Sequence, residues 1–253
     1  MNAVKKMLSV VLAFTFFLSV AVVGFSGEAK ASDPNVQLAY ANTSIDYSGG
    51  SSVYSLTGGV EVKNLAYTKQ VSVAYTTGNG QWNEQPASYA ASNGNGYETW
   101  TFNIVAPASS AFEFSFKYVV NGQTYWDNNG GSNYKVGGTG QPDRILGTSA
   151  LQLSEKHYYS NRSGLYIYGK VYLKNLAPTK TVNVVYSYDN WATTQTATAT
   201  YDSAVAGSNN AFENWTFSFT ANGQPVQFAI SYTVNGVTYW DNNHGANYSL
   251  HFN

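Results

Sequence analysis

Hydrophobic and polar residues alternate along many short stretches of this chain. Trp100, Phe102 and Ile104 are separated by single polar residues, and a period of two residues is typical of a strand with one buried face. The same period is found at Val71, Val73 and Tyr75, at Phe112, Phe114, Phe116, Tyr118 and Val120, at Val182, Val184 and Tyr186, at Trp215, Phe217 and Phe219, and at Phe228, Ile230, Tyr232 and Val234. Many such strands separated by turn residues predict an all-β chain with an antiparallel β-sandwich architecture.

The chain contains an internal repeat, which decides its domain organisation. Residues 60–66 recur as residues 171–177, and residues 120–134 recur as residues 234–248. All six tryptophans fall into matched pairs, namely Trp82 with Trp191, Trp100 with Trp215, and Trp126 with Trp240. The sequence therefore predicts two tandem copies of one module.

The module boundaries follow from the repeat. The first β-sandwich is predicted over residues 36–136 and the second over residues 150–253. Residues 137–149 lie between them and begin with Gly-Gly-Thr-Gly-Gln-Pro, a composition typical of a flexible linker.

The N-terminal residues predict export from the cell. Lys5 and Lys6 precede an apolar run over residues 7–25, and a small-x-small tripeptide ends at Ala31. This is the order of a secretory signal peptide, so we expect residues 1–31 to be removed and the mature chain to be secreted, extracellular and free of the membrane. An uncleaved membrane anchor is the alternative, because the apolar run approaches the ~20 residues that span a bilayer.

Composition excludes several classes of function. The formal net charge is -1 and charged residues make up 11% of the chain, so no basic excess is available to neutralise the phosphates of a nucleic acid. The absence of cysteine excludes disulfides, thiolate nucleophiles and cysteine-bound metals. The histidines, His157, His244 and His251, lack metal-ligand spacing, and we expect neither a metal site nor a cofactor.

Strand phase predicts that Trp126 and Trp240 point away from the core. If the Asn-Gly pair after Val120 forms a two-residue hairpin turn, Trp126 lies opposite Lys117 on the outer face. The second copy gives the same result independently, with Trp240 opposite Ser231. Two outward tryptophans at matching positions predict a binding surface. A ring that is covered by a loop or by the neighbouring module is the alternative.

The other tryptophans have different settings. Trp100 and Trp215 are in phase with core residues and are expected to be buried. Trp82 and Trp191 follow polar turns that contain glycine or asparagine, so each is either a hydrophobic lid or a ligand platform. The outward tryptophan in each copy favours the platform.

A sugar suits such a surface. One face of a glucose ring presents aliphatic C–H groups, which pack against an indole of similar size. Side-chain amides donate and accept hydrogen bonds as hydroxyls do. We therefore expect the rim of the sugar to bond the asparagines that closely follow the outward tryptophans, which are Asn128, Asn129, Asn242 and Asn243.

The shared motifs extend over both copies. They are Val-x-Val-Lys-Asn-Leu-Ala-x-Thr-Lys, a loop tryptophan, Trp-Thr-Phe, and Asn-Gly-x-Thr-Tyr-Trp-Asp-Asn-Asn, with Leu173 replacing the second valine in the second copy. This pattern resembles carbohydrate-binding module family 21. The resemblance implies two immunoglobulin-like sandwiches that bind α-1,4-glucan polysaccharides, namely starch, glycogen and maltooligosaccharides.

The resemblance also implies site residues. In a fungal member of the family, one site stacks sugar on a loop tryptophan and on the aromatic residue before Asp-Asn-Asn. By resemblance, these positions are Trp82 with Trp126 in the first copy and Trp191 with Trp240 in the second. A third aromatic of that site falls on Ser115 and Ala229, so each site is expected to be smaller.

A second site of the fungal module uses a turn tyrosine, a strand aromatic and a lysine. The counterparts are Tyr67, Tyr89 and Lys69 in the first copy, and Tyr201 and Lys180 in the second copy. Pro178 stands in place of the turn tyrosine in the second copy, which weakens the expectation of a second site there. An ordinary turn aromatic is the alternative interpretation of Tyr67.

The preferred hypothesis is a secreted, non-catalytic protein that binds starch- or glycogen-type α-1,4-glucans with avidity from two modules. Secreted amylases are candidate partners. The alternative is an extracellular structural or adhesive β-sandwich protein that binds another glycan or a protein.

An enzyme is disfavoured. The acids matched between copies are Glu98 with Glu213 and Asp127 with Asp241. We expect Asp127 to cap a turn and Glu98 to point outward from a core strand. A glycosidase needs two carboxylates across a cleft, and a small two-layer sandwich offers no obvious deep pocket.

Overall fold

The computed structural model describes residues 35–253, apart from residues 49–50, 79, 107–110, 162–163, 222–224 and 251–253. The predicted signal peptide, residues 1–31, lies outside the described residues. Within the described ranges, no helix is long and apolar enough to cross a membrane. The regular structure there consists of β-strands and a short 3-10 helix, η1 (Asn129–Gly131).

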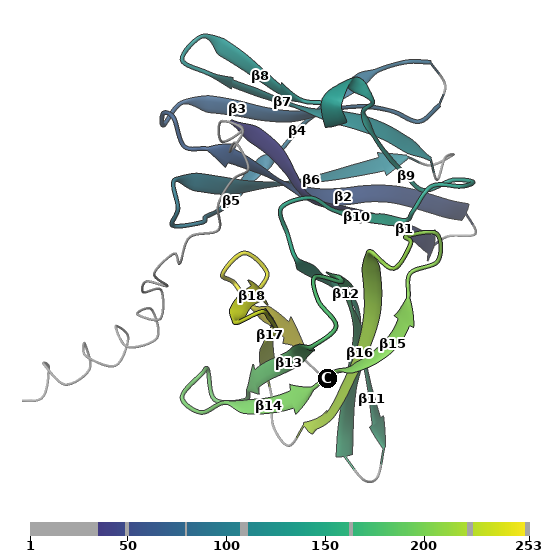
Figure 1. Cartoon of the computed structure of the whole chain (residues 1–253), viewed down its shortest axis with the longest axis vertical. Coiled ribbons are helices and arrows are strands. Elements are labelled where there is room, and N and C mark those ends of the chain that lie inside the picture. The colour runs from purple at the N-terminus through teal and green to yellow at the C-terminus, as the bar shows by residue number, and fades with distance from the viewer. Residues whose placement is uncertain are drawn as a thin grey trace, which may run out of the picture. The chain divides into compact units, whose positions relative to one another are not determined.

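The first repeat forms two antiparallel sheets (Figure 1). The first sheet has the order β10 (Arg144–Leu146), β1 (Val36–Ser48), β2 (Ser51–Lys63), β6 (Tyr97–Ala106) and β5 (Ser88–Ser92). The second has the order β4 (Asn83–Pro86), β3 (Lys69–Thr76), β7 (Phe112–Val120) and β8 (Gln123–Asp127), and β9 (Tyr134–Val136) also pairs with β7. Alternate side chains of both sheets form one core, which includes Val60, Phe102, Phe114, Phe116 and Tyr118.

The second repeat has the same plan. Its first sheet has the order β11 (Leu151–Asn161), β12 (Gly164–Lys174), β16 (Phe212–Ala221) and β15 (Thr200–Ala204). Its second sheet has the order β14 (Gln195–Thr198), β13 (Lys180–Ser187), β17 (Val226–Val234) and β18 (Val237–Asp241), and β19 (Tyr248–Leu250) also pairs with β17. The core includes Val171, Phe217, Phe228, Ile230 and Tyr232. The predicted pair of all-β sandwiches is confirmed.

The hairpins that carry the outward tryptophans have the predicted turns. Asn121 and Gly122 have φ angles of 51° and 71°, and two positive φ angles are required by a type I′ turn. Asn235 and Gly236 repeat this conformation with φ angles of 51° and 75°. The two-residue loop sets the register of each hairpin. Trp126 therefore lies opposite Lys117 and Trp240 lies opposite Ser231, as predicted.

Part of the segment predicted as a linker is a strand. Within residues 137–149, β10 pairs with β1 through Tyr40 and Leu146. Ile145 packs against the first core, and Leu146 is buried. The expectation of a flexible linker is therefore wrong for this part, because two aliphatic side chains add it to the first sheet despite the glycine-rich sequence before it.

A bulge in β11 sets which of its residues face outward. The register with β12 shifts between Leu153 and Glu155, so the buried phase of Leu151 and Leu153 is interrupted. Gly169 lies next to this bulge, and a Cβ on it would come within 2.6 Å of Phe217 Cζ. Glycine is required at this position because the phenylalanine ring lies directly against the backbone.

Candidate functional site

A tryptophan stands on the outer face of the first repeat. Trp126 on β8 pairs with Lys117 on β7, while its neighbour Tyr125 pairs with the buried Tyr118. Trp126 is 52% exposed, and Lys117 Nζ lies 6.0 Å from the centre of its ring, at the limit of a cation–π interaction. The predicted outward orientation is confirmed.

The charges beside Trp126 are paired. Lys117 Nζ lies 3.2 Å from Glu84 Oε2, and the Ser72 hydroxyl donates to Glu84 Oε1 over 2.7 Å. The bond from Ser72, followed by the contact with Lys117, holds the pKa of Glu84 below its ordinary value. The surface next to the indole is therefore polar but has balanced charges, which suits a neutral ligand with hydroxyl groups.

Trp82 belongs to the opposite edge of the same sheet. It immediately precedes β4 and is 50% exposed. The strand order is β4-β3-β7-β8, and neighbouring strands lie ~4.8 Å apart, so the edges that carry the two indoles are separated by roughly 14 Å. Trp82 and Trp126 are thus brought to one sheet, where they flank its two central strands.

The second repeat preserves the outward tryptophan but changes its surroundings. Trp240 on β18 pairs with Ser231 and is 51% exposed, as predicted. Ser231 stands where the first repeat has Lys117, so the ion pair beside Trp126 has no counterpart at this position. Ser115 and Ala229, the positions of the missing third aromatic, are both buried.

Trp191 differs from its counterpart Trp82. It lies in the loop between β13 and β14 with a φ of 69°, and its backbone N–H donates to Ser187 Oγ over 2.9 Å. Its side chain is partly buried, and its ring nitrogen has no hydrogen-bond partner among the described residues. The second repeat therefore presents less indole surface than the first.

Asp189 shapes the loop that carries Trp191. Its carboxylate accepts hydrogen bonds from the Ser187 hydroxyl at 2.7 Å and from the Thr193 backbone N–H at 2.9 Å and hydroxyl at 2.7 Å. These bonds, the Thr193 backbone bond first, lower the pKa of Asp189 to about 2. The stabilisation is present above the ordinary pKa of an aspartate and is lost as the pH falls toward 2, so the loop is held at neutral pH.

The asparagines that follow the outward tryptophans build the loops in which they lie. Asn128 Oδ1 accepts from the Gly131 N–H over 3.0 Å, and Asn129 Nδ2 donates to the Asn133 carbonyl over 3.0 Å. The second copy repeats both bonds, from Gly245 to Asn242 at 2.9 Å and from Asn243 to Asn247 at 3.1 Å. Each of these bonds takes up one of the four hydrogen bonds that a side-chain amide can make.

The aspartates of the same motif tie each loop to its own sandwich. Asp127 Oδ2 accepts from the Leu38 N–H at 2.7 Å and the Tyr134 hydroxyl at 2.9 Å, and Oδ1 accepts from the Asn129 N–H at 3.3 Å. Asp241 repeats this with Leu153 at 2.6 Å and Tyr248 at 2.7 Å. Burial raises the pKa of Asp241, although these donors oppose the effect. The predicted turn cap at Asp127 is confirmed.

The expectation that Glu98 points outward is wrong. Glu98 shares the phase of Trp100, and its side chain is 12% exposed. Its Oε2 accepts from Lys69 Nζ at 2.8 Å and from Trp100 Nε1 at 3.1 Å. The second copy repeats the arrangement, with Glu213 bonded to Lys180 at 2.8 Å and to Trp215 at 2.8 Å. The buried carboxylate is stable there because it is paired and hydrogen-bonded.

Lys69 and Lys180 lie below the surface rather than at the exposed position expected of a ligand-binding lysine. Each side chain is 3% exposed. Lys69 Nζ also donates to Asn64 Oδ1 at 2.6 Å, and Lys180 Nζ donates to Asn175 Oδ1. Both ammonium groups are thus used to join the Asn-Leu-Ala turn to β6 or β16.

Tyr89 and Tyr201 are exposed tyrosines supported from below. Each is 54% exposed. The Tyr89 ring meets Trp100 edge-on at 5.9 Å, and the Tyr201 ring meets Trp215 at 6.2 Å. Trp100 and Trp215 are only partly buried, less than the core position that was expected, and each contacts one of these tyrosines.

The turn before β3 differs between the copies. Tyr67 is 100% exposed, and Pro178 occupies the matching position with its ring also exposed. Glu98 and Trp100, which support Lys69 and Tyr89 from below, were not identified from the sequence. The signal that could have found them is the Glu-x-Trp spacing, which is present in both copies with a matched lysine.

A family model and several known proteins match this chain. The carbohydrate/starch-binding module (family 21) matches residues 32–137 and 147–251. Glucoamylase 1 of Rhizopus oryzae is 37% identical over 132 residues, which cover 49% of this chain and 20% of that protein. Protein phosphatase 1 regulatory subunit 3C of Bos taurus is 35% identical over 89 residues, which cover 32% of this chain and 28% of that protein.

A solved structure is also similar. It is the starch binding domain of Rhizopus oryzae glucoamylase in complex with beta-cyclodextrin and maltoheptaose, with 33% identity and a TM-score of 0.34. The match covers 41% of this chain and 94% of that one. The matched regions thus span less than a third of each of the two full-length relatives but nearly all of the isolated domain.

Proposed function

Because this chain belongs to the carbohydrate/starch-binding module family 21, we propose that it binds starch- and glycogen-type α-1,4-glucans without cleaving them and that both repeats contribute. The observation that carries the proposal is the pair of half-exposed indoles, Trp126 and Trp240, at matching positions on two outer faces. A flat apolar ring beside uncharged or charge-paired polar groups fits one face of a glucose unit and its rim of hydroxyls.

The roles of the matched acids support a non-catalytic function. A retaining or inverting glycosidase needs two carboxyl groups that are free to reach the scissile bond. Asp127 and Asp241 are bound to the backbone of their own sandwiches, and Glu98 and Glu213 are paired with buried lysines. Release of reducing sugar from starch by the purified protein would contradict this part of the proposal.

The proposal includes export. Residues 1–31 have the order of a signal peptide, and residues 36–136 and 150–253 would form the mature modules. Extracellular amylases are then the partners that share this substrate, whereas the similarity to protein phosphatase 1 regulatory subunits would favour a phosphatase as the protein partner. Export is tested by N-terminal sequencing of protein from the culture medium, which is expected to begin at Ser32. Recovery of the uncleaved chain from cells alone would contradict export.

The binding proposal is tested by retention of the purified protein on granular starch, with cellulose and chitin as matched insoluble controls. We expect retention on starch alone, and release by soluble maltoheptaose. Preferential retention on cellulose or chitin would favour the alternative function of an adhesive protein for another glycan.

Single-site variants test avidity. Because linked sites gain roughly 10²–10⁴-fold when both engage a polymer, we expect either Trp126→Ala or Trp240→Ala to lower the affinity for granules by about 10²-fold or more. The remaining site should bind soluble maltoheptaose with its original affinity, as measured by calorimetry. Granule affinity that falls only about twofold would show that the two repeats act separately.

A further inference from the structure

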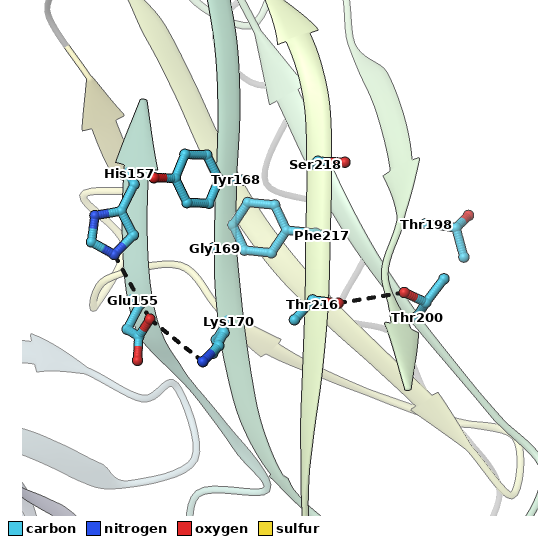
Figure 2. A pocket seen from close by; sticks show the side chains of 10 residues that line it. All are labelled: Glu155, His157, Tyr168, Gly169, Lys170, Thr198, Thr200, Thr216, Phe217 and Ser218. Carbon is cyan, nitrogen blue, oxygen red and sulfur yellow. Dashed lines mark hydrogen bonds and ion pairs between the residues drawn. The ribbon is translucent and has the colours of Figure 1, made fainter. Parts of the chain in front are cut away.

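A hollow of about 500 Å³ lies on the outer face of the β11-β12-β16-β15 sheet of the second repeat (Figure 2). Its volume is in the range of small-ligand sites, ~300–1,000 Å³. Trp240 belongs to the other sheet of this sandwich. Tyr201 adjoins Thr200 on β15, and consecutive strand residues face opposite sides, so Tyr201 is turned away from the hollow. The hollow is therefore distinct from both sites considered above.

The hollow has an aromatic wall and a hydroxyl wall. On β11 and β12, the rings of His157 and Tyr168 are stacked with centroids 5.2 Å apart. Across the hollow, Thr200 and Thr216 lie with their hydroxyl oxygens 3.5 Å apart, and Figure 2 shows Ser218 on the same strand as Thr216. An aromatic face opposite a row of hydroxyls offers stacking to one side of a sugar ring and hydrogen bonds to its rim.

The charges in the hollow are balanced. Glu155 Oε2 lies 3.9 Å from Lys170 Nζ and 3.7 Å from His157 Nε2, as the dashed lines in Figure 2 mark. The negative charge of Glu155 offsets the positive charge of Lys170. An anionic ligand would therefore meet a carboxylate together with the ammonium group. Both charged groups can still bond hydroxyls, which favours a neutral polyol ligand over a phosphate or sulfate.

The fold does not require this aromatic wall. The register of the first repeat pairs Asn42 with Thr57 where the second repeat pairs His157 with Tyr168. The first sandwich packs its core with these smaller residues in place. The side chains His157 and Tyr168 are therefore additions to the surface of the second repeat.

In the first repeat, a side chain occupies the position that corresponds to the hollow. Tyr40 and Gly59 stand where the second repeat has Glu155 and Lys170. The Tyr40 ring lies against Gly59 so closely that a Cβ there would come within 2.7 Å of Tyr40 Cε1. The surface that forms a hollow in the second repeat is thus covered by a tyrosine ring in the first.

The hollow adjoins β14, the edge strand of the sheet that carries Trp240. Thr198 lines it and pairs with Asn183, which pairs in turn with Ser231, the partner of Trp240. Three strand spacings, roughly 14 Å, separate the two ends of this row. A polymer lying along the row from Trp240 reaches the hollow at Thr198.

We propose that this hollow is an accessory subsite of the second repeat that takes a segment of the neutral α-glucan, with Tyr168 as the stacking surface and Thr200 and Thr216 as hydrogen-bond partners. The inference rests on the proposed function, because the occupant is the same polymer. It adds a binding surface that the first repeat lacks.

The test is an NMR titration of the full mature chain with maltoheptaose. Backbone signals of Lys170, Thr200 and Thr216 report on the hollow, and the indole N–H signals of Trp126 and Trp240 report on the tryptophan faces. We expect saturable shifts in both groups. Tyr168→Thr, which installs the residue of the first repeat, should weaken binding in the hollow about threefold to tenfold and leave the indole titration unchanged.

Thr216→Val provides a second variant that keeps the aromatic wall, and it should weaken the same shifts. Indole shifts without shifts in the hollow would overturn the inference and leave the proposed function standing. The absence of shifts in both groups would overturn both. Shifts of the hollow with dextran sulfate but not with maltoheptaose would overturn the assignment to a neutral glucan.

Discussion

The double variant Trp126→Ala, Trp240→Ala is expected to lose retention on granular starch while remaining folded. Removing a central tryptophan from a binding surface costs about 2 kcal/mol or more, which is about 30-fold in affinity per site. The double variant removes one such ring from each repeat, and the loss of both also removes the gain from linked attachment. We therefore expect granule affinity to fall by more than about 10³-fold, measured by depletion of the protein from solution over a starch suspension.

Stability separates this effect from unfolding. Both rings are half exposed on outer faces, so the free energy of unfolding should change by less than about 1 kcal/mol. Val105→Ala is the matched control, because Val105 is also an exposed hydrophobic residue at 55% but lies on the other sheet. Full retention of the double variant on starch, with an unchanged melting temperature, would remove the tryptophan faces from the mechanism.

Lys69→Ala is expected to lower the free energy of unfolding by about 3 to 5 kcal/mol, because it leaves the buried carboxylate of Glu98 without its counter-charge. Trp100 Nε1 would be the remaining partner of Glu98 Oε2, and the turn at Asn64 would lose its bond to the ammonium group. Urea unfolding of the variant measures this loss. The second repeat offers an independent replicate in Lys180→Ala.

The control for this prediction is Lys117→Ala. Lys117 and Glu84 form an exposed pair, with 30% and 49% of their side chains accessible, and exposed pairs contribute about 0–1 kcal/mol. If Lys69→Ala kept its stability but lost affinity for maltoheptaose, the lysine would be a ligand, as the family resemblance implies. A large loss of stability in Lys69→Ala alone supports the structural role.

The sequence alone was sufficient to predict features that depend on a single turn or a single strand. The outward orientation of Trp126 and Trp240 depends only on the Asn-Gly turn and on a period of two residues. The strand pairing of both hairpins follows from these two features. The two sandwiches could also be predicted, because the alternation of hydrophobic and polar residues and the internal repeat are both visible along the chain. Glu98 could also have been assigned correctly, since its phase is that of Trp100.

The tertiary structure decided every feature that depends on what lies across a sheet or beneath a turn. Lys69 is a plausible ligand residue from its motif, but its ammonium group is enclosed because β6 brings Glu98 to it. Trp191 matches Trp82 in sequence, yet the bonds to Ser187 and Asp189 give its loop a different path. The hollow beside Tyr168 combines residues from five strands, β11, β12, β14, β15 and β16, and no spacing along the chain brings such residues together before the strands pair.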